Sequence, residues 1–277
     1  MRMGLQITEK AIEAAREKGD EAPLLYFEEM LRPAYEMRLR FLDLRYAFCK
    51  LTIKDKTTGE IRELREPNPG QWMIFDALHK QYMAGAPERL IDTKCRQFGG
   101  SCASLGYFYL MSKRYPGQNI LVVAHEEEVS EWLFGMFTRF YTYDKYAPDR
   151  ELPPKQKAKI RETECEFEWP EVLGKGLTKI STGYKDKSGS GRTFHRALFS
   201  EIEKWRNPEN AIKVLSQMIP MAAKTTIIYE SNPLVSGGYF HKIVRGKKDG
   251  HTRIFVGWQS EPGDSKEFAD TAERDDF

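Results

Sequence analysis

The sequence predicts an α/β fold in which a mostly parallel sheet is flanked by helices, and three observations support this fold class. Strand-like apolar runs alternate with helix-like segments from residue 89 onwards, as in a parallel sheet covered on both faces. The run Ile120–Ala124 has no polar alternation, which is typical of a strand buried on both sides. The chain has 277 residues, 40% of them apolar, which is enough for one large domain with an appendage.

Three segments of the chain differ in composition. Residues 1–48 are charged and their apolar residues recur at helical spacing, so we expect an N-terminal helical appendage. Residues 49–262 should form the core. Residues 263–277 are polar and acidic, so we expect a frayed tail or the start of a linker.

The core should begin with a hairpin, because apolar and polar residues alternate across residues 49–66 around a turn at Lys56–Gly59. The remaining helices are predicted at Trp72–Met83, Ser101–Lys113, Glu126–Tyr141, Pro208–Met218 and Gly238–Val244. The strands are predicted at Arg89–Cys95, Ile120–Ala124, Ala197–Phe199, Thr225–Tyr229 and Ile254–Trp258, with β structure also between Phe167 and Ile180, and a polar loop over residues 144–163.

Composition narrows the classes of function. The net charge is +2, whereas a protein that wraps nucleic acid non-specifically is usually more basic, so DNA contacts would come from local patches or from several copies in a ring. No apolar run approaches the roughly 18 residues of a membrane span, and the N-terminus carries no secretory signal. The four cysteines are not spaced as CxxC, which argues against zinc and redox pairs.

The segment from Lys94 to Ser101 lies between a predicted strand and a predicted helix, where a phosphate-binding loop belongs. Gly99 and Gly100 allow the backbone to approach phosphate oxygens, and the Ser101 hydroxyl stands where such a loop places its magnesium ligand. The pattern departs from G-x-x-x-x-G-K-[ST], since Gly100 takes the lysine position. Lys94 could reach the β- and γ-phosphates from the front of the loop, with Arg96 as a second cation. A plain strand–turn–helix connection is the alternative.

An acidic strand end follows about 100 residues later. Ser200 and Glu201 come directly after the apolar run Ala197–Phe199. A glutamate in this place can polarise the attacking water, so Glu201 is the expected general base. Ser200 replaces the usual aspartate and would help to hold magnesium, through water. The alternative for Glu201 is a solvated carboxylate at a strand end.

Three further features suit a nucleotide site. The Gln71 amide could pair with the adenine edge. Ser231 and Asn232 end an apolar strand and could sense the γ-phosphate by hydrogen bonding, although a strand exit that uses Asn-Pro as a turn is the alternative. Arg192 follows a Gly-rich segment and could act as an arginine finger, in cis or from a ring neighbour. Arg196 is the other arginine before the acidic strand, and a solvated loop arginine is the alternative for Arg192.

These motifs resemble those of phage terminase large subunits over residues 45–260. The string from Lys94 to Ser101 resembles their variant Walker A, K-x-R-Q-x-G-x-S/T, and Ser200-Glu201 is similar to the pattern in which S-E replaces D-E. The string that starts at Glu230 is similar to their coupling motif. The resemblance implies a P-loop NTPase fold of the ASCE type, with Lys94 as the phosphate lysine. It implies that the nucleotide contacts are Lys94, Arg96, Gln97, Gly99, Gly100, Ser101, Cys102 and Gln71.

The resemblance also implies a function. The family hydrolyses ATP with Mg²⁺ to move double-stranded DNA into a procapsid, as a homo-oligomeric ring at the portal, together with a small terminase subunit, in the host cytoplasm. The isolated domain would be a monomer. The family's nuclease domain needs a carboxylate cluster beyond the last predicted strand, where about 20 residues remain, so we expect no nuclease activity in this chain.

Two alternatives remain open. Another P-loop DNA motor, such as a helicase, would normally keep G-K-[ST] and D-E and would carry a second motor domain. A non-hydrolysing module that binds nucleic acid or a capsid on a degenerate P-loop fold would explain Gly100 and Ser200 in place of the usual lysine and aspartate.

Overall fold

The computed structural model divides the chain into two compact units between Lys50 and Leu51. In the first unit, Asp43 caps the helix α4 (Leu44–Cys49) by accepting a hydrogen bond from the Tyr46 backbone N–H. Over both units, the structure describes residues 36, 39–40, 42–55, 57–95, 98–147, 150, 158–168, 175–182, 192–232, 237–246 and 250–257.

The second unit contains a two-stranded hairpin and an eight-stranded sheet. The hairpin pairs β1 (Thr52–Lys54) with β2 (Ile61–Glu63), which confirms the predicted alternation. The order of strands in the sheet is β10 (Thr252–Val256), β3 (Glu88–Lys94), β9 (Thr226–Ser231), β8 (Arg196–Ser200), β4 (Ile120–Ala124), β7 (Lys175–Thr182), β6 (Glu164–Glu168) and β5 (Lys159–Ile160).

The sheet is parallel from β10 to β7, and only β6 and β5 are antiparallel. This confirms the predicted mostly parallel sheet. The predicted polar loop over residues 144–163 is wrong at its end, because β5 occupies two of its residues. Lys159 and Ile160 are both exposed, so this edge strand is held by main-chain pairing and shows no apolar alternation.

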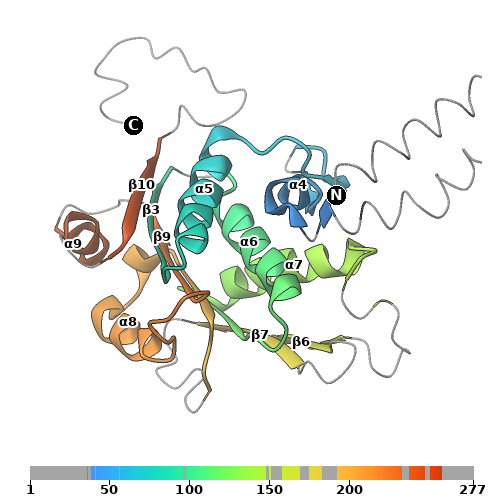
Figure 1. The fold of residues 1–277 in the computed structure, drawn as a ribbon. Coiled ribbons are helices and arrows are strands. Elements are labelled where there is room, and N and C mark those ends of the chain that lie inside the picture. Colours follow the sequence, from blue (N-terminus) through green and yellow to red (C-terminus); the bar gives the residue numbers. More distant parts are fainter. Residues whose placement is uncertain are drawn as a thin grey trace, which may run out of the picture. The chain divides into compact units, whose positions relative to one another are not determined.

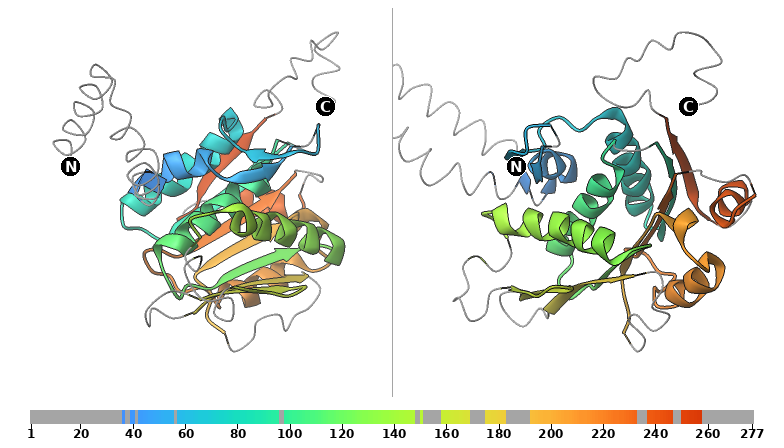
Figure 2. Two further views of the ribbon diagram at one scale, coloured as in Figure 1. Left: turned by 90° about the vertical axis from the view of Figure 1, so that its right-hand side faces the viewer. Right: turned by 180° about the vertical axis from the view of Figure 1, so that it is seen from behind.

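Helices cover both faces of the sheet (Figures 1 and 2). On one face lie α5 (Pro69–Met83), α6 (Gly100–Arg114) and α7 (Glu127–Tyr143), and on the other lie α8 (Pro208–Ser216) and α9 (Tyr239–Arg245). Strand residues that point to the second face, such as Ile91 and Phe199, form one apolar cluster with Ile212, Leu215 and Phe240. Burial of both faces explains the uninterrupted apolar run of β4 and the apolar middles of β8 and β9.

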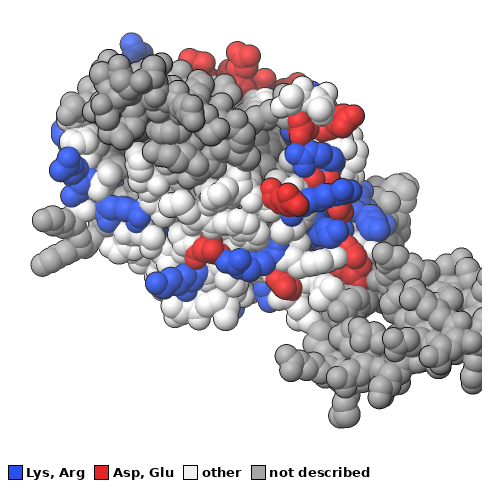
Figure 3. Space-filling model, turned by 90° about the horizontal axis from the view of Figure 1, so that it is seen from above, with Lys and Arg blue, Asp and Glu red and all other residues white. Residues whose placement is uncertain are grey.

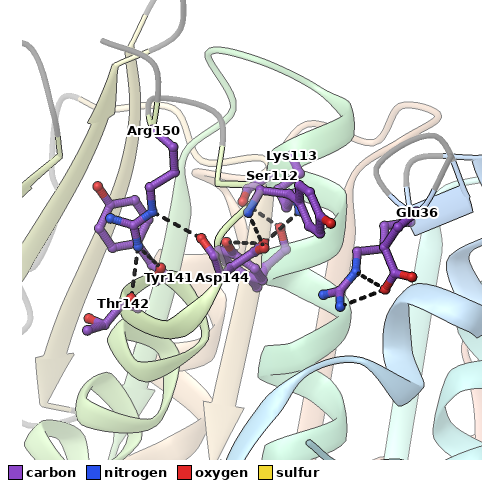
Figure 4. Close-up of polar contacts among 10 residues, drawn as sticks. Glu36, Ser112, Lys113, Tyr141, Thr142, Asp144 and Arg150 are labelled. Carbon is purple, nitrogen blue, oxygen red and sulfur yellow. Dashed lines mark hydrogen bonds and ion pairs between the residues drawn. The ribbon is translucent and has the colours of Figure 1, made fainter. Parts of the chain in front are cut away.

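A polar cluster joins α6 to the end of α7 (Figure 4). Lys113 Nζ lies 2.6 Å from Asp144 Oδ2. Arg150 donates to the main-chain oxygens of Tyr141, Thr142 and Asp144, and it thereby satisfies carbonyl groups at the end of the helix. Burial alone would raise the pKa of Asp144, but the Lys113 charge and hydrogen bonds lower it. The helix that follows the predicted phosphate loop is thus fixed to its neighbour.

The topology places β9 between β3 and β8. The predicted phosphate loop and the predicted acidic strand end therefore lie one strand apart. The register sets Asp92 opposite Glu230, and Glu230 opposite Ser200. Because parallel strands end at the same edge, this row of polar residues lies at the carboxyl edge of the sheet.

A second polar row lies at the amino edge, where Glu88, Thr226 and Arg196 are in register. Arg196 is fully buried and donates to Gln118 and to the Lys224 carbonyl. Burial raises the pKa of Glu88, and the Arg196 charge opposes this rise. Arg196 is therefore an internal counter-charge of the sheet.

We predict that Arg196→Met lowers the free energy of unfolding by about 3–5 kcal/mol, because it removes the larger of two positive charges that oppose the burial penalty of Glu88, together with the contacts to Gln118 and the Lys224 carbonyl. Arg192→Met is the matched control, since Arg192 is exposed and its replacement should change stability by no more than about 0.5 kcal/mol. Urea unfolding of the two variants measures the difference, and equal effects would contradict the assignment.

Candidate functional site

Most of the described residues that the sequence singled out lie at the carboxyl edge of the sheet. Lys94 is the last residue of β3 and Ser200 the last of β8, with Glu201 next in the chain. Ser101 lies in the first turn of α6. Binding groups in open α/β sheets collect at this edge because loops and helix N-termini converge there.

Lys94 is the centre of the site. Its ammonium group donates to Ser101 Oγ at 3.1 Å, lies 3.1 Å from Glu230 Oε1, and is 3.7 Å from Glu201 Oε1. Burial alone would lower the pKa of Lys94, but the nearby carboxylates outweigh it and raise the pKa. The expected juxtaposition of Lys94 and Glu201 is thus found in the structure, and the lysine is charged at neutral pH.

Glu230 is a site residue that sequence reasoning did not single out. Its side chain is fully buried, and its Oε1 accepts hydrogen bonds of 2.6 Å from both the Ser101 and the Ser200 hydroxyls. The signal was a glutamate at the end of an otherwise apolar strand, where a charge is costly unless it is paired. One carboxylate oxygen therefore joins the loop, the acidic strand end and β9.

Asp92 was missed as well. It lies opposite Glu230 in the register, is fully buried, and neither of its carboxylate oxygens has a hydrogen-bond partner. Burial and the Glu230 charge raise the pKa of Asp92 to about 8, although Lys94 opposes the rise. Asp92 is therefore protonated at neutral pH.

Glu201 adopts a left-handed backbone conformation with φ of 55°. For a residue other than glycine this costs about 1–3 kcal/mol and is most often found at functional sites. Trp205 Nε1 donates to the Ser200 carbonyl at 2.9 Å and holds the turn. Lys204 Nζ lies 3.3 Å from Glu201 Oε2. The strained turn directs this carboxylate toward Lys94, one strand away.

Residues at the start of α5 form hydrogen bonds with the loop before α6. Asn68 and Gln71 form a capping box, Asn68 Nδ2 donates to the Phe98 carbonyl, and Gln71 Nε2 donates to the Gly99 carbonyl. Gly99 has φ of 89°, and a Cβ there would lie 2.7 Å from Gln71 Nε2. Both ends of the Gln71 amide are therefore engaged in the protein, and its contact with adenine stays a prediction.

The structure describes only some of the other loop residues that were predicted to contact the nucleotide. Gly100 and Cys102 lie in the first turn of α6, and Cys102 is half-buried. Arg96 and Gln97 lie outside the described residues. Their roles toward a nucleotide stay predictions.

Ser231 does not point toward Lys94. Its hydroxyl accepts from the Glu203 backbone N–H at 3.2 Å and donates to the Asn232 carbonyl. Glu203 in turn accepts from the Phe240 N–H at the start of α9. Ser231 thus connects β9 to the turn after Glu201. The predicted coupling role of Ser231 and Asn232 stays a prediction.

The structure does not bring Arg192 to the site. Arg192 precedes β8, whereas Glu201 follows it, and a strand of five residues spans about 16 Å. The Arg192 guanidinium instead lies 3.3 Å from Glu164 Oε1. An arginine finger supplied by Arg192 in cis does not fit this arrangement, and the role in a ring neighbour stays a prediction.

The site offers oxygen ligands for a hard cation, but not a closed protein cage. Among the described residues, no group of three or more His, Cys, Asp and Glu side chains could hold a metal ion. Two hydroxyls and one carboxylate oxygen do converge at Glu230, and Mg²⁺ is commonly held by one or two carboxylates together with waters and phosphates.

None of the helices that the structure describes has the length and apolar character of a membrane span.

We predict that Asp92 makes stability fall with rising pH. Its pKa is about 8 in the folded protein against an ordinary 3.8, so between these values the folded state holds one more proton than the unfolded chain. The free energy of unfolding should fall by up to about 1.4 kcal/mol per pH unit and level off above pH 8. Asp92→Asn should remove this slope. Urea unfolding from about pH 5 to 9 tests this, and parallel curves for the two proteins would contradict it.

No protein-family model matches the sequence, and no curated protein sequence is significantly similar to it. Solved structures are similar in fold. The large terminase of a thermophilic bacteriophage matches with a TM-score of 0.55 and 10% identity over 73% of this chain and 48% of that one. The complex of the same terminase with ATP-gamma-S matches with a TM-score of 0.53 at 10% identity, over 73% and 47%. The HK97 bacteriophage large terminase gives 0.49 at 16% identity, over 67% and 36%.

This chain spans about half the length of the thermophilic phage terminase. At such low identity the likeness to that terminase carries the fold alone. The chain therefore has the fold seen in the large terminase of that thermophilic phage.

Proposed function

We propose that this chain is the ATPase domain of a viral DNA-packaging motor, which hydrolyses ATP with Mg²⁺ to move double-stranded DNA into a procapsid. The observation that carries the proposal is the position of Lys94, which lies at the front of a glycine turn and 3.7 Å from Glu201 Oε1. A cation for the triphosphate and a carboxylate for the water thus lie on either side of one strand, in a P-loop fold.

The phosphates would bind at the start of α6. This helix has 15 residues and begins after Gly99, which has no side chain with which to cap it, so its first N–H groups suit an anion. Lys94 would neutralise phosphate charge. Its close contact with Glu230 would have to be exchanged for phosphate oxygens, which a flexible lysine side chain permits.

Glu201 would act as general base. It is half-buried, and Lys204 Nζ lies 3.3 Å from its second carboxylate oxygen, the one that does not face Lys94. Positioned carboxylates of this kind typically contribute about 10²–10⁴-fold to a rate. Mg²⁺ would supply charge neutralisation at the phosphates, with Ser101 and Ser200 as the hydroxyls close to it.

The same proposal includes the partners of the motor, which are double-stranded DNA, the portal and procapsid, and the small terminase subunit. It also includes assembly into a homo-oligomeric ring. On the face in Figure 3, basic and acidic side chains are interspersed over the described residues. Such a surface, with a net charge of +2, suits DNA contacts that add up over several subunits better than tight binding by one copy.

We predict that Glu201→Gln lowers magnesium-dependent ATP turnover by at least about 100-fold, because the amide cannot accept the proton. The affinity for ATP should change little, since Glu201 acts on water and not on phosphate. Steady-state phosphate release and nucleotide titration give the two quantities. Weak turnover is expected for a single copy of the wild-type chain, because no neighbour supplies an arginine in trans.

Lys94→Ala should instead weaken nucleotide binding by roughly 10- to 100-fold, the effect of losing a charge-assisted contact of about 1.5–3 kcal/mol. Lys213→Ala is the control, since Lys213 is an exposed lysine on α8. Turnover and affinity that are unaffected by both Lys94→Ala and Glu201→Gln would remove the proposed site. Binding of ATP without turnover under every condition would favour a non-hydrolysing module.

A further inference from the structure

Ser200 leaves the proposed magnesium site one carboxylate short on β8. The structure contains a carboxylate in the adjacent position on the next strand, since Glu230 is the register partner of Ser200. The two side chains are in contact, with Ser200 Oγ donating to Glu230 Oε1 at 2.6 Å. The charge that is missing on one strand is therefore present on its neighbour.

We propose that Glu230, on β9, supplies the magnesium-site carboxylate that Ser200 does not, so that the metal is held by Glu230 together with Ser101. This inference rests on the proposed function, because it names the ligand of the same nucleotide site.

Oxygens from different elements converge on one point at Glu230. Ser101 Oγ and Ser200 Oγ come from different elements, yet both donate to Glu230 Oε1. Hard divalent cations prefer such hydroxyl and carboxylate oxygens. Ser101 is also the residue that a phosphate-binding loop offers to magnesium. A metal beside Ser101 therefore has Glu230 as its nearest protein carboxylate among these contacts.

Glu230 also has a buried carboxylate oxygen that takes no part in those hydrogen bonds. The other carboxylate oxygen of Glu230, Oε2, is fully buried without a hydrogen-bond partner, as are both oxygens of Asp92 beside it. Buried polar atoms in this state are costly and usually have a partner that binds there. Glu230 Oε2 belongs to the same carboxylate that both serine hydroxyls contact through Oε1, so Glu230 has an acceptor to spare for a cation.

A cation, the Lys94 ammonium group, already binds these oxygens. The ammonium group of Lys94 lies 3.1 Å from both Ser101 Oγ and Glu230 Oε1. Ser101 and Glu230 would therefore be the residues that hold Mg²⁺ in place of the ammonium group, and Lys94 would be free to contact the phosphates.

The test measures binding of ATP-gamma-S by calorimetry with and without Mg²⁺, so that it does not depend on turnover. The quantity compared is the gain in affinity that Mg²⁺ gives. Glu230→Gln keeps the shape and an acceptor for both serines but loses the charge, and the gain should fall at least about tenfold. Glu88→Gln is the matched control, since Glu88 is also fully buried on the same sheet but at its amino edge, and the gain should stay unchanged.

The double variant Ser200→Asp/Glu230→Gln moves the carboxylate back to β8 and should restore most of the gain. If Glu230 had only a structural role, the double variant would not recover the gain in affinity that Mg²⁺ gives. Should Glu230→Gln fail to fold in thermal unfolding, Ser200→Asp alone decides, because a second carboxylate should increase the gain several-fold.

An unchanged gain in Glu230→Gln overturns the inference, as does a lost gain that the double variant does not recover, or an unchanged gain in Ser200→Asp. Tighter binding of Glu230→Gln without metal, together with an unchanged gain, would identify Glu230 as a counter-ion of Lys94 only. A wild-type chain that binds no ATP-gamma-S at all overturns the proposed function, and this inference with it.

Discussion

A single buried ammonium group organises the site. Lys94 is almost fully buried, and a lysine in that environment is stable as a cation only because carboxylates of Glu230 and Glu201 lie close to it. Lys94 and these two carboxylates lie at the ends of three strands that are distant in sequence but adjacent in space. The insertion of β9 between β3 and β8 is therefore a chemical requirement of the site as well as a feature of the topology.

The same arrangement connects the site to the rest of the domain. β9 contributes Glu230 to the site on one face and Ser231 to the other, where its hydroxyl contacts the turn after Glu201. Glu203 in that turn binds the start of α9. The end of β9 is thus linked to the turn after Glu201 and, through Glu203, to a helix on the far face of the sheet.

Much of the fold could be predicted from the sequence, because apolar runs and helix signals report local structure. The strand ends at Lys94 and Ser200 were found in this way, and their proximity followed from the order of motifs. Glu230 and Asp92 could not be found, since their role depends on the register across β3, β9 and β8. The burial of Arg196 could not be predicted either, since a buried arginine on a strand is indistinguishable, in sequence, from one in a loop. The Gln71 amide is engaged by Asn68 and Gly99, contacts that only the folded chain reveals.

A crystal structure of the chain with ATP-gamma-S and Mg²⁺ tests the central claim most directly. The account predicts phosphate oxygens at the start of α6 within hydrogen-bonding distance of Lys94, with the ammonium group withdrawn from Glu230. A nucleotide bound elsewhere, with the contact between Lys94 and Glu230 unchanged, would contradict it.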